Sequence, residues 1–438
     1  MRKFLFIVLL CFFINGLFVA VVNPVLAPSD LVENSWNTKT SMSQARSNLG
    51  VVAVEGKIYA IGGTIFHNSH NTESVVVGTN ERYDPTSDTW ITLESMPAPR
   101  RDFAIVAYQN KIYCIGGETN PLHSDPCDMV EVYDIATNSW STKASIPFNG
   151  GDLQANVVDG KIFVTTFAGN AGFANDMKQL KDGLPLVKKN CLRLFMYDPT
   201  ANSWTEKTGV TTNLAMSNCG HVSTVLNDKI LIVSSTWHTV LEYRSADSPN
   251  PVFTGIIESN VLVYDPKLDV WNKINSIPEE IVVYDYGIGI TSGIDTPQRI
   301  YLIQGQKTYI YDPAKDTWAT GKSMSTERSF FGVATVNNIL YVIGGSIMKP
   351  AENYTGPVLI VQESVSINEQ YIPGIGTLIS SPNQPNPSDL ETSTTPTDTD
   401  TVNPDLPKIS AYIIATIIVI IIAGAVGSLV LFQKRKKT

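Results

Sequence analysis

Residues 58–63 read Ile-Tyr-Ala-Ile-Gly-Gly, and residues 83–90 read Tyr-Asp-Pro-Thr-Ser-Asp-Thr-Trp. Both patterns return along the chain. The second begins at Tyr83, Tyr133, Tyr197, Tyr264 and Tyr311, and it ends seven residues later at Trp90, Trp140, Trp204, Trp271 and Trp318. Repeats at a fixed spacing indicate one structural unit used several times, so they decide the architecture before any single motif does.

The first pattern has three complete copies and three degenerate ones. The complete copies carry the pairs Gly62-Gly63, Gly116-Gly117 and Gly344-Gly345. The degenerate copies begin at Ile162, Ile230 and Ile300, with Thr165-Thr166, Ser234-Ser235 and Gln304-Gly305 in place of the glycines. Six copies between residues 28 and 373 give about 58 residues per unit.

Each unit is predicted to supply four short strands. The segments before the glycine pairs and around the tyrosines are β-branched and aromatic, and turn residues bound them. Asp-Pro after the tyrosine favours a turn, and a glycine pair allows a buried strand to end with positive φ. Repeating four-stranded units of this length are typical of propeller blades.

The combination of a glycine pair with a spaced Tyr and Trp resembles the Kelch repeat family. The resemblance covers about four-fifths of the chain and implies an all-β, six-bladed β-propeller. Trp36 precedes the first glycine-pair strand by the usual interval, whereas no Trp follows the last one. We therefore expect residues 34–42 to form the outer strand of the last blade and to close the ring, with Tyr371 ending the neighbouring strand.

The two ends of the chain predict a compartment. Residues 1–27 have the charged start, apolar core and small-residue exit of a secretory signal peptide. Residues 374–408 are rich in Pro, Thr and Ser and are expected to form a stalk. Residues 409–432 carry no charge, which predicts a single transmembrane helix, and the basic tail 433–438 favours a cytoplasmic C-terminus. The propeller, residues 28–373, is then expected outside the cell.

Charge excludes one class of partner. The net charge is −9, and without the six basic residues at the two ends 26 basic residues remain against 41 acidic ones, a net charge of −15. Such a surface repels phosphate backbones, so nucleic acid is not an expected partner.

Function is expected on the propeller face that carries the long insertions, residues 64–78, 118–129, 167–190 and 236–259, which we call the loop face. The five histidines, His67, His70, His123, His221 and His238, fall there too. They belong to separate blades and lack ligand spacing, so we predict solvated histidines, no metal site and no cofactor.

Three arginines, Arg46, Arg100 and Arg328, stand thirteen residues before the aromatic of each complete glycine-pair strand. On one interpretation they line an arc of the channel mouth and bind an anionic ligand. On the other, each arginine bonds loop carbonyls of an adjacent blade.

Cysteines and one sequon complete the candidates. Cys114 lies inside a glycine-pair strand and is expected to be buried. Cys191 and Cys219 could pair outside the cell, although spacing does not prove it. Asn353 is a glycosylation sequon.

Two classes of function stay open. The first is a surface-displayed binding or adhesion module for a protein or glycan ligand. The second is a sugar-modifying enzyme, because propellers resembling this family include a sialic-acid mutarotase and a galactose-oxidase-like oxidase. The oxidase is disfavoured because no room exists for the extra domains that complete its copper site, and no Tyr/Cys/His constellation can be assembled. For the mutarotase, Arg100, Arg328 and Glu327 are available, but no general acid-base pair is identifiable by spacing.

Overall fold

A computed structural model describes residues 33–66, 74–121, 126–148, 153–167, 189–212, 216–242, 252–274, 278, 286–294, 296–350, 360–374 and 377–378. All of them belong to the compact unit formed by residues 1–381. Within these ranges no helix is long and apolar enough to cross a bilayer. The predicted signal peptide, most of the predicted stalk, the stretch 409–432 and the tail lie outside the described residues.

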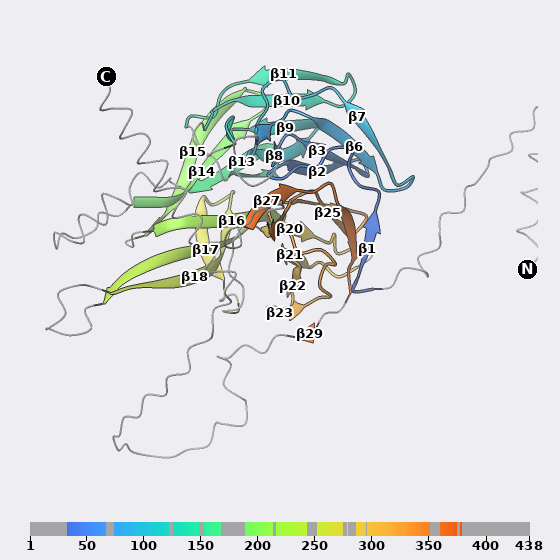
Figure 1. Cartoon of the computed structure of the whole chain (residues 1–438). Coiled ribbons are helices and arrows are strands. Elements are labelled where there is room, and N and C mark those ends of the chain that lie inside the picture. Colours follow the sequence, from blue (N-terminus) through green and yellow to red (C-terminus); the bar gives the residue numbers. More distant parts are fainter. Residues whose placement is uncertain are drawn as a thin grey trace, which may run out of the picture. The chain divides into compact units, whose positions relative to one another are not determined.

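Six antiparallel sheets form the blades (Figure 1). Five of them have four strands, and the sheet of blade 5 has five. Blade 1 contains β2 (Gly50–Val54), β3 (Lys57–Ile61), β6 (Asn80–Asp84) and β7 (Thr89–Leu93). Blade 2 contains β8 (Ala104–Tyr108), β9 (Lys111–Ile115), β10 (Val130–Asp134) and β11 (Ser139–Lys143). Blade 3 contains β12 (Gln154–Val158), β13 (Lys161–Phe167), β14 (Lys189–Asp198) and β15 (Ser203–Thr212).

The second half of the chain supplies the other three blades. Blade 4 contains β16 (Met216–Leu226), β17 (Lys229–Glu242), β18 (Val252–Asp265) and β19 (Val270–Ile274). Blade 5 contains β20 (Tyr286–Ile290), β21 (Ile300–Gln304), β22 (Lys307–Asp312) and β23 (Thr317–Thr320), and β29 (Thr377–Leu378) adds a fifth strand. Blade 6 contains β24 (Gly332–Val336), β25 (Ile339–Ile343), β28 (Asn368–Ile372) and β1 (Ser35–Lys39).

The expected closure of the ring is confirmed. β1 pairs antiparallel with β28, and Trp36 lies opposite Tyr371. The innermost strands contact one another in the circular order β2, β8, β12, β16, β20, β24 and back to β2. The N-terminal strand therefore completes the blade that the C-terminal end of the propeller begins.

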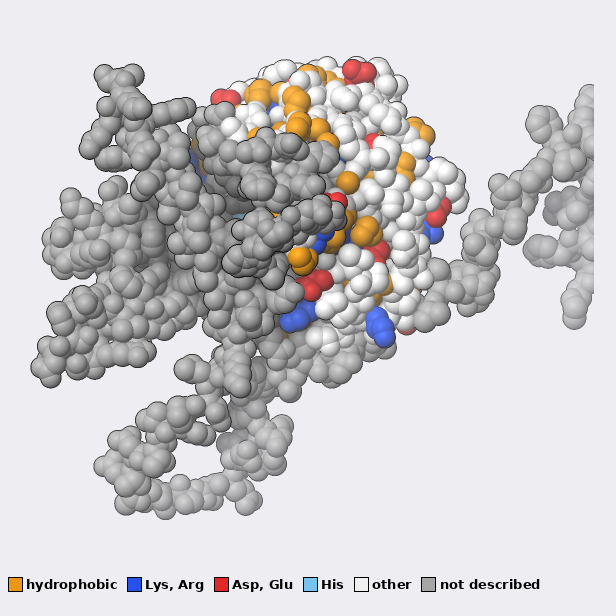
Figure 2. Space-filling model, in the orientation of Figure 1, with side chains coloured by type: hydrophobic (Ala, Val, Ile, Leu, Met, Phe, Trp, Pro, Cys, Tyr) orange, Lys and Arg blue, Asp and Glu red, His pale blue; other side chains and the backbone are white. Residues whose placement is uncertain are grey.

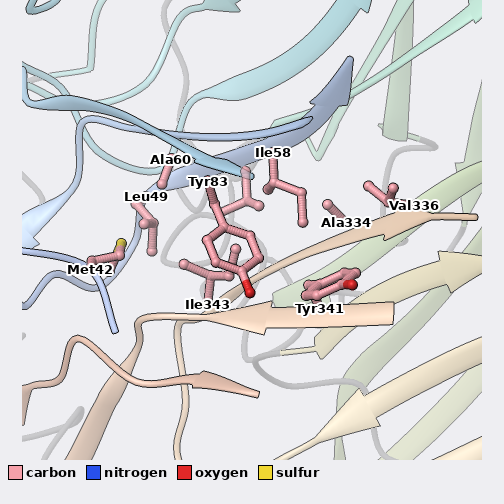
Figure 3. Close-up of a cluster of buried hydrophobic side chains, with 10 residues drawn as sticks. Met42, Leu49, Ile58, Ala60, Tyr83, Ala334, Val336, Tyr341 and Ile343 are labelled. Atoms are coloured by element: carbon pink, nitrogen blue, oxygen red, sulfur yellow. The ribbon is translucent and has the colours of Figure 1, made fainter. Parts of the chain in front are cut away.

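Apolar cores lie between neighbouring blades. Where blade 6 meets blade 1, Tyr83 and Tyr341 pack with Ile58, Val336 and Ile343 (Figure 3). Each of these side chains comes from a strand on which alternate residues face the neighbouring sheet. Burial of this apolar surface is the main force that holds the blades together.

A polar lock repeats beside these cores. An Asn or Asp two residues before each repeat tryptophan has positive φ, between 50° and 54°, and its side chain accepts the hydroxyl hydrogen of the repeat tyrosine. The residues of this set are Asn34, Asp88, Asn138, Asn202, Asp269 and Asp316. Asn and Asp tolerate the left-handed region better than other residues with a side chain.

The same lock joins one blade to the next. In five blades the backbone N–H of a residue in the preceding blade donates to the Asn or Asp, and the carbonyl of that residue accepts the tryptophan indole N–H. Glu94, for example, donates to Asn138 over 3.0 Å and accepts from Trp140 over 2.8 Å. The tryptophans thus serve the inter-blade contact, as expected, through a hydrogen bond as well as by packing.

Two expectations need correction. The pairing of Gln154 with Thr165 matches that of Gly50 with Ile61, so Thr166-Phe167 replaces the glycine pair in blade 3, one residue later than predicted. The insertion 236–259 is not a plain loop, because β17 and β18 stay paired as far as Glu242 and Val252. This hairpin projects from the ring (Figure 1).

Candidate functional site

The two faces of the propeller differ in the length of their strand connections. On one face, the first and second strands of most blades are joined by two-residue turns, such as Asn227-Asp228 and Asn337-Asn338, with positive φ at both residues. The loop face carries the hairpins β4–β5 (Thr64–Ile65 and Val75–Val76) and β26–β27 (Ser346–Pro350 and Ile360–Ser364), and the extended β17–β18. Elaborated loops on a rigid scaffold are the usual place for binding.

The hairpins β4–β5 and β26–β27 contact each other at the junction of blades 6 and 1. The Ser364 hydroxyl donates to the Thr64 carbonyl over 3.0 Å and accepts from the Phe66 N–H over 3.0 Å. Val75 and Met348, one from each hairpin, are each 50% exposed. The two neighbouring hairpins thus each carry an exposed apolar side chain, and we call this pair of hairpins the ledge.

The three arginines at this level are buried rather than open to a ligand. Arg46 and Arg100 are fully buried, and Arg328 is 2% exposed. Arg46 contacts Glu81 over 2.6 Å, Arg100 contacts Glu131 over 2.6 Å, and Arg328 is ion-paired with Glu369. The expectation that these guanidiniums line an open arc of the mouth is thus not met.

Arg46 illustrates what such a pair does. Its side chain donates to the carbonyls of Gly62 and Thr79 in blade 1, while its own carbonyl accepts the Gly345 N–H of blade 6. Burial lowers the pKa of Arg46, and the charge of Glu81 opposes this shift. Arg46 therefore links blade 6 to blade 1. The prediction placed its carbonyl partners in an adjacent blade, whereas its side chain bonds carbonyls of blade 1, which directly follows it in the chain.

The glutamates that pair with these arginines were not predicted from the sequence, although their regular spacing from the repeat tyrosine could have identified them. Glu81, Glu131 and Glu369 each stand two residues before the repeat tyrosine of blades 1, 2 and 6. In blades 3, 4 and 5 the same place holds Phe195, Leu262 and Tyr309. Gly150 and Asn218 stand in the arginine place of blades 3 and 4. Arginine and glutamate are therefore present or absent together, as expected for a buried ion pair.

A central cavity of about 210 Å³ lies where the six blades meet. All six innermost strands contribute to its wall, with Phe103, Leu153 and Phe331 among the apolar residues. Gly50, Gly287 and Gly332 also line it, and an added Cβ on any of them would collide with a side chain of the next blade. Among the described residues of the wall, the polar side chains are Gln154 and Ser223, which belong to blades 3 and 4.

The polar part of the wall continues into the junction of blades 3 and 4. Asn156 donates to the Ser223 hydroxyl over 2.6 Å, and Thr165 Oγ1 lies 3.0 Å from His221 Nε2. His221 is 6% exposed, which corrects the expectation of a solvated histidine, and burial lowers its pKa to about 4. Sister blades hold apolar residues at these places, for example Leu49 where blade 4 has His221.

Other candidate residues are placed only in part. Cys114 is buried, as predicted, and burial raises its pKa to about 12. The side chains of Cys191, Cys219 and His238 lie outside the described residues, as do Asn353, His67, His70 and His123. Across the described ranges, no group of His, Cys, Asp and Glu side chains could hold a metal ion.

Charged side chains on the face in Figure 2 are scattered. The described Lys and Arg groups stand among Asp and Glu groups, and no basic cluster gathers there (Figure 2). Several ion pairs lie on the face with the two-residue turns, where Lys57 contacts Asp84 and Lys161 contacts Asp198, each over 2.6 Å. On the described surface, neither feature selects a ligand of one charge.

Part of the chain matches a known repeat family. The Kelch motif matches residues 45–97 and 99–147, which span blades 1 and 2. The chain is thus a six-bladed β-propeller whose first two blades match the Kelch motif.

Its relatives are similar over part of their length. Kelch-like protein 7 of Rattus norvegicus is 36% identical over 180 residues, which is 31% of this chain and 30% of the relative. Kelch-like protein 25 of Xenopus tropicalis is 26% identical over 259 residues, 58% of this chain and 36% of the relative. The matches thus span about a third of these relatives. A solved structure titled "Structure of YjhT" aligns with a TM-score of 0.48 at 14% identity and covers 76% of this chain and 96% of that one.

Proposed function

We propose that this Kelch propeller is a binding module that engages a protein or glycan ligand through its loop face. The observation that carries the proposal is the difference between the faces. One face has short turns, whereas the other has three additional or extended hairpins and the apolar ledge of Val75 and Met348. Propeller strands bond mainly to one another, so variation for binding is expected in such projections.

The described residues of the loop face do not favour an anionic ligand. The three arginines that suggested one are engaged by Glu81, Glu131 and Glu369. The ledge at blades 6 and 1 offers apolar contact, and the aliphatic Val75 and flexible Met348 suit a surface that adapts to a partner.

We also propose that the module is displayed outside the cell on a single membrane anchor. The sequence supports this by the signal-like residues 1–27, the uncharged stretch 409–432 and the basic residues 434–437. In this arrangement the Pro- and Thr-rich residues that follow β29, as far as residue 408, separate the propeller from the membrane.

A binding screen tests the proposed face. The purified full chain is first applied to arrays of glycans and of extracellular proteins, and the affinity for each ligand found is then measured for three variants. Val75→Asp and Met348→Asp place a charge on the ledge and are expected to weaken binding at least tenfold. Ile294→Asp changes a side chain that is 85% exposed on the opposite face, and it should leave the affinity unchanged.

The screen also has outcomes that contradict the proposal. Loss of binding in the Ile294 variant alone would place the site on the short-turn face. Unchanged affinity in all three variants would remove the ledge from the interface.

A further inference from the structure

The outer edge of β18 is the longest strand edge that blade 4 leaves uncovered. β17 and β18 pair without a register shift from Ile230 and Tyr264 to Glu242 and Val252. The next strand, β19, pairs only with Val261–Asp265. On the other side, β16 pairs with β17 no further than His238. Within the described residues, the last rungs of this hairpin are therefore a two-stranded ribbon.

The turn between β16 and β17 fixes which backbone groups face that outer edge. Leu226 and Lys229 flank the two-residue turn Asn227-Asp228, whose φ values are 51° and 59°. Residues that flank such a turn form a hydrogen-bonded pair, and hydrogen-bonded and open pairs alternate along a strand. Ile230 therefore bonds to Tyr264 on the β18 side. Because the register holds, the even-numbered residues of β18 bond to β17.

The odd-numbered residues Phe253, Gly255 and Ile257 thus direct their N–H and C=O groups to the outer side of β18. No strand of the described part of the chain pairs with them there. An isolated two-stranded ribbon is marginally stable in water, and a long uncovered edge is a template for another strand. The edge is therefore suited to accept a further strand.

We propose that this edge pairs with the same edge of a second copy of the chain, giving a two-fold symmetric dimer. Identical strands related by a two-fold axis pair antiparallel, as all the other strands in this propeller do. In a register centred on Gly255, Phe253 lies opposite Ile257 of the second copy, and the outward groups meet one another.

Charge is compatible with this self-pairing. Glu258 is the single charged residue among residues 252–258, and in the register centred on Gly255 it lies opposite Val252 of the second copy. Like charges are therefore not placed directly opposite each other, which would destabilise the pair. The segment is also rich in Val, Ile, Phe and Thr, which favour strands.

Blade 5 provides a precedent within the same molecule. There β29 adds to the outer strand β23, with Ala319 opposite Leu378 and Thr320 opposite Thr377. An outer edge of this propeller is therefore compatible with an additional antiparallel strand. The dimer does not depend on the proposed ligand, because it uses blade 4 and not the ledge of blades 6 and 1.

Sedimentation of the purified full chain in detergent tests the dimer. The expected mass is that of two chains of 47.9 kDa each, falling to one on dilution. Ile257→Pro removes an outward N–H without removing a bond to β17, so it should weaken the dimer at least tenfold. Ile257→Val keeps the N–H and should sediment like the unmodified chain. Phe253→Pro provides a second variant of the same kind, and thermal unfolding confirms that each variant is folded.

Two results would overturn the proposal. If the chain sediments as a monomer at every concentration, the edge of β18 does not pair with a second copy. A dimer that persists equally in folded Ile257→Pro and Ile257→Val would lie elsewhere in the chain. Neither result bears on ligand binding, which is measured with the Val75 and Met348 variants.

Discussion

The side chain of Asn34 accepts a hydrogen bond of 2.8 Å from the hydroxyl of Tyr371, a residue 337 positions further along the chain. The same oxygen accepts the Lys322 N–H over 2.7 Å, and the Lys322 carbonyl accepts the Trp36 indole N–H over 2.8 Å. This is the inter-blade lock of the other blades, formed here between the two ends of the propeller. The ring closes through a contact that blades 1 to 4 also use.

Replacing Asn34 with Ala should lower the free energy of unfolding by about 1–3 kcal/mol, since it leaves the Lys322 N–H and Tyr371 hydroxyl without their acceptor. Asn34→Asp retains the acceptor oxygen and should cost less. Asn37→Ala, in the adjoining strand β1 and exposed, serves as the control. Urea unfolding measures all three, and equal midpoints for the Asn34→Ala and Asn37→Ala variants would contradict the role of the lock.

We expect the stability effects of substituting Arg46 and Glu81 to be strongly non-additive. Arg46→Met leaves a buried carboxylate without its partner and should destabilise the protein by about 3–5 kcal/mol. The double variant with Glu81→Leu resembles blade 4, where neither charge is present, and should recover much of that loss. A double-mutant cycle of unfolding free energies tests this, and additive losses would show that the two residues act independently.

His221 predicts a loss of stability in acid. Its pKa in the folded protein is about 4, below the ordinary value of 6.5, so the unfolded chain binds the proton more readily between these values. Its contribution is therefore complete above pH 6.5 and falls as the pH drops towards 4. At 1.36 kcal/mol per unit, the full difference is about 3 kcal/mol.

The carboxylates titrate in the same range, so the effect of His221 must be isolated by substitution. For example, Lys57 lowers the pKa of Asp84, and Lys161 lowers that of Asp198. The protein therefore also loses the stabilising contribution of these carboxylates in acid. The variant His221→Leu with Thr165→Val restores the apolar pair of sister blades and should lose less stability between pH 7 and pH 4.5 than the unmodified chain. The comparison uses melting temperatures, and parallel pH curves would contradict the assignment.

The proposed topology predicts a defined fragment. Protease added to intact cells that express the chain should release a soluble propeller by cutting within residues 374–407, because a Pro- and Thr-rich segment without a core is poorly protected. Antibodies against the propeller detect the fragment in the medium. If it appears only after the cells are lysed, the propeller faces the cytoplasm.

The sequence by itself determined the architecture, because the fold is a repeat. The Tyr-to-Trp interval and the glycine pairs reported the same four strands in each unit, and the unmatched Trp36 predicted the closing strand β1. Local chemistry sets these features: β-branched residues favour strands, and Asn or Asp tolerates positive φ. Such signals are readable in a window of a few residues.

The site was decided by the tertiary structure. An arginine at a loop position looks the same in the sequence whether it faces solvent or a buried glutamate 35 positions away, as Arg46 faces Glu81. Likewise, the predicted solvated His221 is buried because blade 3 brings Thr165 beside it. Contacts across blades depend on how the sheets pack, and burial then decides whether a charged or polar group is available to a ligand or serves the fold.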